Sequence, residues 1–191
     1  MKWGNVWKDS TVVVMASGPS LNAQDIETVR QWREAEPNRY VIVTNTTYKP
    51  ALWADALFFH DYKWWKKYAD DVRARFKGQL VTVAPVNAPD VDWLRDWNSY
   101  GNSGAAAIAL SVLAGAKRVI LLGLDCQYTD GKRHWHGDHP SGLGNARSLK
   151  KWPAGFKRLA DHCRAKGVEV INASRATALE CFERQALEDV L

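Results

Sequence analysis

Residues 102–128, NSGAAAIALSVLAGAKRVILLGLDCQY, place an alanine-rich segment directly before a strongly hydrophobic one. The first part, 102–116, is apolar nearly all round, which is typical of a helix that packs closely against a sheet. The second part, 117–125, is an aliphatic run of the kind found in strands that are buried on both faces. Together the two segments predict one helix–strand unit of an α/β fold.

The same alternation extends along the chain in both directions. We therefore expect a single Rossmann-like α/β domain over residues 1–191, with a mainly parallel sheet of about six strands and helices on both faces. The expected strands lie within 10–18, 39–45, 54–61, 78–85, 117–125 and 168–174, and the expected helices within 22–37, 62–76, 102–116, 153–167 and 177–191. The polar, glycine-rich stretch 126–152 is long for a loop in a compact domain, which predicts a functional lid.

The composition fits a folded cytoplasmic protein with a sizeable core. The chain has 191 residues, of which 46% are hydrophobic. It has no apolar run of the roughly 18–20 residues that span a bilayer, and its start lacks a signal-peptide core, so we expect no membrane partner. The three widely spaced cysteines predict reduced thiols. The net charge of +5 is concentrated in 145–166, which indicates either a solvated helix face or a surface that attracts phosphates. The oligomeric state is not predicted.

Small hydrogen-bonding residues follow the predicted strands one after another. In an open parallel sheet, ligands bind beyond the carboxyl ends of the strands. Backbone N–H groups and serine hydroxyls at these ends suit a phosphate, and Asn and Asp side chains suit a base and a ribose. Each residue alone is also explained by a turn or a helix cap, and neither G-x-G-x-x-G nor a Walker A lysine is present. The repetition favours a nucleotide site made by Ser17, Gly18, Pro19, Ser20, Asn45, Asn102, Ser103, Gly104, Asp125, Tyr128, Asn172 and Ser174.

Three of these stretches, ASGPSL, NSGAAAIALSVLAGAKRVILLGLDCQY and VINAS, resemble a glycosyltransferase-like superfamily. It includes bacterial sialyltransferases of the Campylobacter type and flagellin-glycosylation proteins with a GxGPSL motif. The resemblance covers residues 12–174, with Ala16 in place of the first motif glycine. A closer resemblance over nearly the whole chain is to small tailed-phage proteins that carry HWHGDHP.

The superfamily resemblance implies roles for several residues. The loop Ser17–Leu21 and Asn45 would bind the nucleotide, and the serine and glycine that open the alanine-rich helix would contact its phosphate. Asp125 and Tyr128 would lie near the ribose or a phosphate.

The resemblance also implies an activity. It predicts a metal-independent glycosyltransferase that takes a nucleotide-sugar donor, such as a CMP- or UDP-sugar, requires no other cofactor, and uses a lid histidine as general base. The acceptor is open, with modified DNA as one candidate, and a related pterin diphosphokinase group makes diphosphate transfer a lesser alternative. A non-catalytic protein that sequesters a nucleotide and a DNA-binding module are further alternatives.

The stretch HWHGDHP admits three interpretations. His134, His136, Asp138 and His139 have the H-x-H-x-D-H spacing of binuclear metal hydrolases, but only His162 follows, so that ligand set looks incomplete. A single Zn²⁺ held by the three histidines is a simpler metal alternative. A histidine could instead be the general base, oriented by Asp138. The third interpretation is that these side chains only hydrogen-bond one another in a closed lid.

A second candidate region follows the predicted strand 54–61. His60 and Asp61 form either a satisfied turn or a contact to the sugar or acceptor. In the functional interpretation, Trp64 or its neighbour Trp65 would be a stacking plate for a ring.

Overall fold

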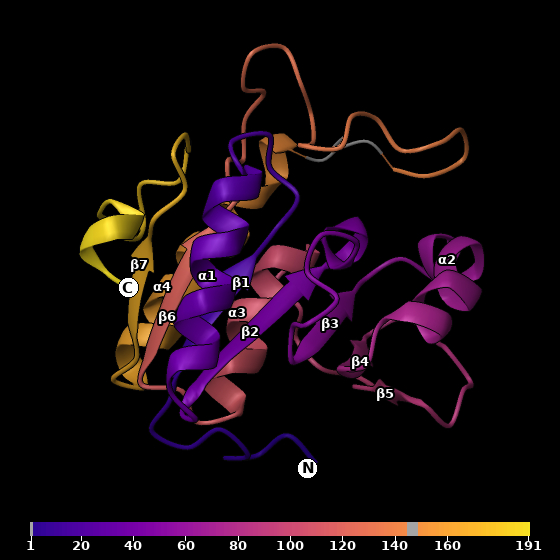
Figure 1. The fold of residues 1–191 in the computed structure, drawn as a ribbon, viewed down its shortest axis with the longest axis horizontal. Helices are drawn as coiled ribbons and strands as arrows, with labels where there is room; N and C mark the ends of the chain where they lie inside the picture. The colour runs from indigo at the N-terminus through magenta and orange to yellow at the C-terminus, as the bar shows by residue number, and fades with distance from the viewer. Residues whose placement is uncertain (1, 145–148) are drawn as a thin grey trace.

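A single sheet of eight strands runs through the chain in the computed structural model, which describes residues 2–144 and 149–191. The strand order is β5-β4-β3-β2-β1-β6-β7-β8, and all adjacent strands are parallel (Figure 1). The strands are β1 (Thr11–Met15), β2 (Arg39–Thr44), β3 (Ala56–Phe59), β4 (Gln79–Thr82), β5 (Val91–Trp93), β6 (Arg118–Leu122), β7 (Glu169–Asn172) and β8 (Glu183–Arg184). The α-helices are α1 (Ala23–Ala35), α2 (Tyr62–Arg75), α3 (Ser103–Leu113) and α4 (Trp152–Ala165), and the 3-10 helices are η1 (Asn45–Tyr48), η2 (Leu149–Lys151) and η3 (Leu187–Asp189).

The predicted fold class is confirmed, because the chain forms a Rossmann-like α/β domain with one parallel sheet and helices on both faces. The sheet has two more strands than the six expected. Both extra strands, β5 and β8, are edge strands of three and two residues, which is too short to show a periodicity in sequence.

The helix expected over 177–191 is wrong. The segment instead forms β8 and η3, and it wraps around the edge of the sheet. Leu179 and Phe182 are buried in the core on the α3 side of the sheet, whereas Leu187 and Val190 are buried in the core on the α1 side. A single straight helix could not reach both faces, so burial on two sides overrides the helical propensity of the sequence.

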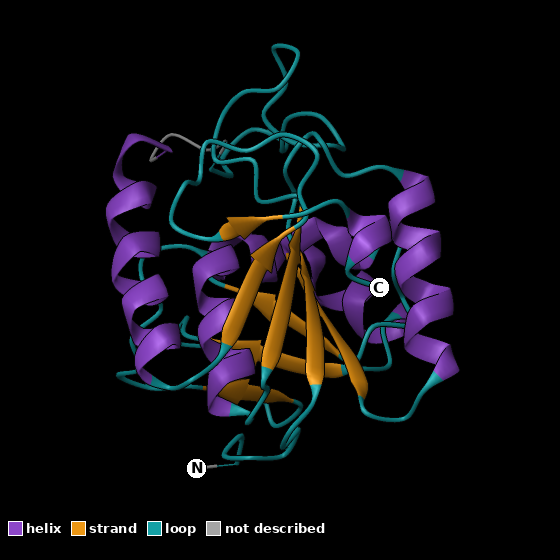
Figure 2. Ribbon diagram, turned by 90° about the vertical axis from the view of Figure 1, so that its left-hand side faces the viewer, coloured by secondary structure: helices purple, strands orange, loops and turns teal. Residues whose placement is uncertain are grey.

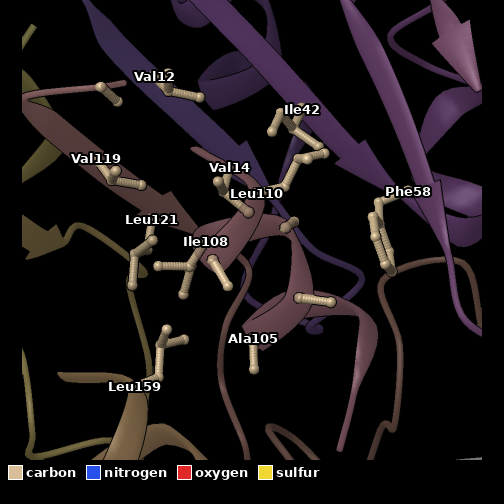
Figure 3. Packing of buried hydrophobic residues seen from close by; sticks show 14 of the residues in the cluster. Val12, Val14, Ile42, Phe58, Ala105, Ile108, Leu110, Val119, Leu121 and Leu159 are labelled. Atoms are coloured by element: carbon tan, nitrogen blue, oxygen red, sulfur yellow. The ribbon is translucent and has the colours of Figure 1, made fainter. Parts of the chain in front are cut away.

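Alternating side chains of the central strands build two core layers. Val12 and Val14 of β1 point toward α3 and α4, while Val13 and Met15 point toward α1. Figure 3 shows the first layer, with Ile108 of α3 among the strand residues. The helix α3 is buried from Gly104 to Ser111, as its apolar sequence predicts, because it lies between the sheet and α4. No described helix is both long enough and apolar enough to cross a membrane.

The strand order places a topological switch point at the centre of the sheet. The chain moves outward from β1 to β5, then crosses through α3 to β6 on the other side of β1. Loops that leave β1 and β6 therefore diverge to opposite sides, which opens a crevice at their carboxyl ends. Figure 2 shows the connecting loops gathered beyond the arrowheads of the central strands.

Candidate functional site

A cavity of about 350 Å³ lies at this switch point. It is bounded by the loops that follow β1, β2, β3 and β6, by the start of α3, by the first turns of α4 and by the lid, residues 126–152. Residues 145–148 of the lid are outside the described part of the chain. The predicted site residues that line the cavity are Ser17, Gly18, Pro19, Asn45, His60, Asp61, Trp64, Asn102, Ser103, Gly104, Asp125, His134 and His139.

The N-terminus of α3 forms the floor of the cavity. Asn102 caps the helix, since its side-chain oxygen accepts from the Ala105 N–H at 2.9 Å, while its Nδ2 is buried without a hydrogen-bond partner among the described residues. Asn45, in the left-handed region with φ 47°, donates from Nδ2 to the Ser103 Oγ at 3.2 Å. The unpaired N–H groups of the first turn carry a partial positive charge, so this corner favours an anion.

The loop after β1 is held from beneath by Asp125. The Ser20 N–H and hydroxyl donate to its two carboxylate oxygens at 2.9 and 2.6 Å, and the Thr129 hydroxyl donates at 2.8 Å. Burial raises the pKa of Asp125, although these hydrogen bonds act in the opposite direction. A Cβ on Gly18 would lie 2.2 Å from Asp125 Oδ1, so the glycine is required by loop packing. Ser20 and Asp125 therefore bind each other in this structure, and their predicted ligand roles stay predictions.

The lid is docked on the same loop through two hydrogen-bonded contacts. The Trp135 N–H donates to the Ser17 carbonyl at 3.1 Å, and the Trp135 indole donates to Thr47 Oγ1 at 3.2 Å. The Ser17 hydroxyl is 2.9 Å from the same Thr47 oxygen. Ser17 is thus a junction between the β1 loop, η1 and the lid, with a hydroxyl that is already engaged.

Besides Ser20, three predicted nucleotide ligands lie outside the cavity. Asn172 and Ser174 are buried at the end of β7, where Asn172 binds Thr177 and the Ser174 hydroxyl accepts from the Leu124 N–H at 2.9 Å. They brace the loop after β6 and do not line the cavity, and their ligand roles stay predictions. Tyr128 is 54% exposed on the lid and does not line the cavity.

The predicted sugar or acceptor region lies on the far wall of the cavity. The His60 Nε2 is 2.9 Å from the Ser99 hydroxyl, and burial lowers the pKa of His60. Asp61 caps α2 by accepting from the Lys63 N–H at 2.7 Å. Trp64 is 3% exposed and is packed against Tyr48 and neighbouring rings. It therefore lines the cavity without exposing a ring face on which a ligand could stack.

Its neighbour Trp65 is also buried, stacked on Phe59 with ring centroids 4.7 Å apart. Its ring is therefore engaged in core packing, and the stacking role stays a prediction.

The three lid histidines converge. Their ring centroids are 4.7–5.2 Å apart, and the rings of His134 and His136 are stacked. His134, His136 and His139 each offer one ring nitrogen that could bind a metal ion, and these three nitrogens all lie within 4.8 Å of one another. Among the described residues no other His, Cys, Asp or Glu group of this kind is found, so a second metal position of a binuclear hydrolase is not formed there. Asp138 forms an ion pair with Arg133 at 3.0 Å.

Partial burial keeps these imidazoles neutral at neutral pH. Burial, together with the nearby His139, lowers the pKa of His134 and of His136 to about 4. Burial also lowers the pKa of His139, but the carboxylates of Asp138 and Asp61 act against it. Neutral rings present lone pairs that can accept a proton or bind a metal ion.

Some residues of the site could not be found in the sequence. Trp152 and Phe156 of α4 give the cavity an apolar wall, and Thr47 anchors the lid. Phe156 lies within the predicted helix, Trp152 at the end of the predicted lid and Thr47 in a polar turn, and no local signal marks any of the three as a site residue. No family model matches this chain, and no curated protein matches it at a significant level.

Proposed function

We propose that this protein binds a nucleotide or nucleotide-sugar in the switch-point cavity and transfers the glycosyl group to an acceptor. The observation that carries the proposal is the convergence of the N-terminus of α3, the Asn45–Ser103 pair and the Gly18 loop on one cavity at the switch point. This is where open parallel sheets bind nucleotides, and the volume is within the range of ligand sites.

The polarity of the cavity suggests an orientation for the donor. The phosphates would lie at the α3 N-terminus, where the free N–H groups and the unpartnered Asn102 Nδ2 can donate to them. The apolar wall formed by Trp152 and Phe156 suits a base or ribose. The sugar would then extend toward His60 and the lid.

The lid supplies the groups that a transfer reaction needs. An acceptor hydroxyl must lose its proton to a general base, and His134 and His139 line the cavity as neutral rings. The departing nucleotide gains negative charge, which the α3 N-terminus and Arg133 can stabilise. The His136 ring stacks on that of His134 and does not line the cavity.

The test is nucleotide binding by the full chain, measured by calorimetry with CMP, UDP, GDP, ADP and their sugar derivatives. We expect one nucleotide class to bind, and Asn45→Ala and Ser103→Ala each to weaken binding about tenfold, the effect of a lost hydrogen bond to a charged group. Thr28→Ala, on the exposed face of α1, is the matched control and should bind as wild type.

Turnover separates the enzyme from a sequestering protein. Release of free nucleotide from the bound nucleotide-sugar would support transfer, whereas tight binding without any release would assign the non-catalytic alternative. Absence of binding across the whole panel, or equal binding by the Ser103→Ala variant, would overturn the proposal.

A further inference from the structure

We propose that His134, His136 and His139 form a binding site for one Zn²⁺ ion at the roof of the cavity. Imidazole nitrogens bind zinc at about 2.0–2.1 Å in a tetrahedron, which sets ligand nitrogens about 3.3 Å apart. The three side chains already hold their nitrogens within 4.8 Å of one another. Small side-chain rotations would bring them to the coordination distance.

A second observation points to a ligand at the same place. The Nε2 atoms of His134 and His136 are buried and have no hydrogen-bond partner among the described residues. Burying an unsatisfied polar atom destabilises a fold, so such atoms usually have a partner. A metal ion between the rings would satisfy both nitrogens at once.

The backbone of the lid is built to hold the rings in this arrangement. Trp135 docks on Thr47 and Ser17, which fixes the turn formed by Trp135 and His136 against the β1 loop. Gly137, with φ 83°, donates its N–H to the His134 carbonyl at 3.1 Å. This tight turn brings His139 back onto the other two rings.

The ligand chemistry selects the class of ion. Three neutral imidazoles suit zinc and related transition metals, whereas Mg²⁺ and Ca²⁺ require oxygen ligands. Two of the ligands, His134 and His139, line the cavity, so the fourth coordination position would open toward it. Zinc lowers the pKa of bound water, so a hydroxide there would replace a histidine as the base of the transfer reaction when the ion is bound. That consequence rests on the proposed function, whereas the zinc site does not.

The site is tested by titrating chelator-treated full-length protein, free of any histidine tag, with Zn²⁺ in a calorimeter. We expect one ion per chain and no binding of Mg²⁺. His134→Gln, His136→Gln and His139→Gln should each weaken zinc binding by more than about 100-fold, since even the loss of an outer-shell contact costs 10–100-fold. His162→Gln removes the α4 histidine outside the cluster and is the matched control, expected to bind zinc as wild type.

Two further measurements keep the outcome decisive. If a variant does not fold, the visible absorption of Co²⁺ bound to wild-type protein reports whether nitrogen ligands surround the ion in a tetrahedron. No zinc binding by the wild type, or equal loss in His162→Gln, would overturn the site. Nucleotide titrations with and without zinc separate the two proposals: binding of nucleotide alone would leave the function standing and the metal site refuted, and binding of zinc alone would do the reverse.

Discussion

Gly18 has no room for a side chain, because the loop after β6 packs directly against it. A Cβ there would lie 2.2 Å from Asp125 Oδ1 and 2.4 Å from the Gly123 carbonyl oxygen. We expect Gly18→Ala to lower the free energy of unfolding by about 1–3 kcal/mol, the usual effect of overpacking, as measured by urea denaturation. Gly144→Ala is the control, because a Cβ there meets nothing within 4 Å, and its change should stay within about 0.5 kcal/mol. Equal stabilities for the two variants would contradict the packing argument.

The neutral lid imidazoles predict a pH dependence in metal-free protein. The pKa of His134 and of His136 is lowered to about 4, below the ordinary value of 6.5. Between pH 6.5 and 4 the unfolded chain binds protons that the folded chain excludes, so the free energy of unfolding should fall as the pH falls through this window. Each ring contributes at most about 1.4 kcal/mol per pH unit.

Urea denaturation of chelator-treated protein at pH 7 and pH 5 checks this dependence. The double variant His134→Gln/His136→Gln should show a shallower loss between the two pH values. A loss as steep as that of wild-type protein would assign the effect to other groups.

The lid is held as an element by few polar contacts, and Thr47 is central to them. Its hydroxyl lies at hydrogen-bond distance from both the Trp135 indole and the Ser17 hydroxyl. Thr47→Val keeps the shape and removes the hydroxyl, which should cost about 1–3 kcal/mol and release the lid. We expect trypsin to cleave after Lys132 or Arg133 several times faster in this variant, and nucleotide affinity to drop. Thr28→Val is the control; if it were cleaved as fast, lid docking through Thr47 would be excluded.

The elements themselves were predictable where a hydrophobic period is long enough to read. The helix α3 and the strand β6 follow directly from the apolar run between residues 104 and 124, because a helix or strand buried all round has little polar surface. The helix predicted over 177–191 was wrong because this segment contains strong helix formers, but its apolar residues are buried on two different faces of the sheet.

The strand order of the whole molecule explains which predicted site residues lie together. Asn45 and Ser103 are far apart in sequence but in contact in the structure, because β2 ends and α3 begins beside β1. Asn172 and Ser174 follow a strand in the same way, but β7 is separated from β1 by β6 and lies beyond the switch point. Position at the end of a strand predicts that a residue lies at the carboxyl edge of the parallel sheet. Only the order of the strands decides how far along that edge it lies from the switch point.

Local chemistry in the sequence determined the α/β class, the parallel sheet, the buried α3 and the presence of a polar lid rich in histidine. These features depend on periodicity and composition, which neighbouring residues reveal. The tertiary structure alone decided that Asp125 binds Ser20, that Trp64 is buried, and that three histidine rings meet at the roof of a cavity. Each of these depends on how distant loops pack and how side chains turn, and a polar side chain's partner is fixed only when that packing is complete.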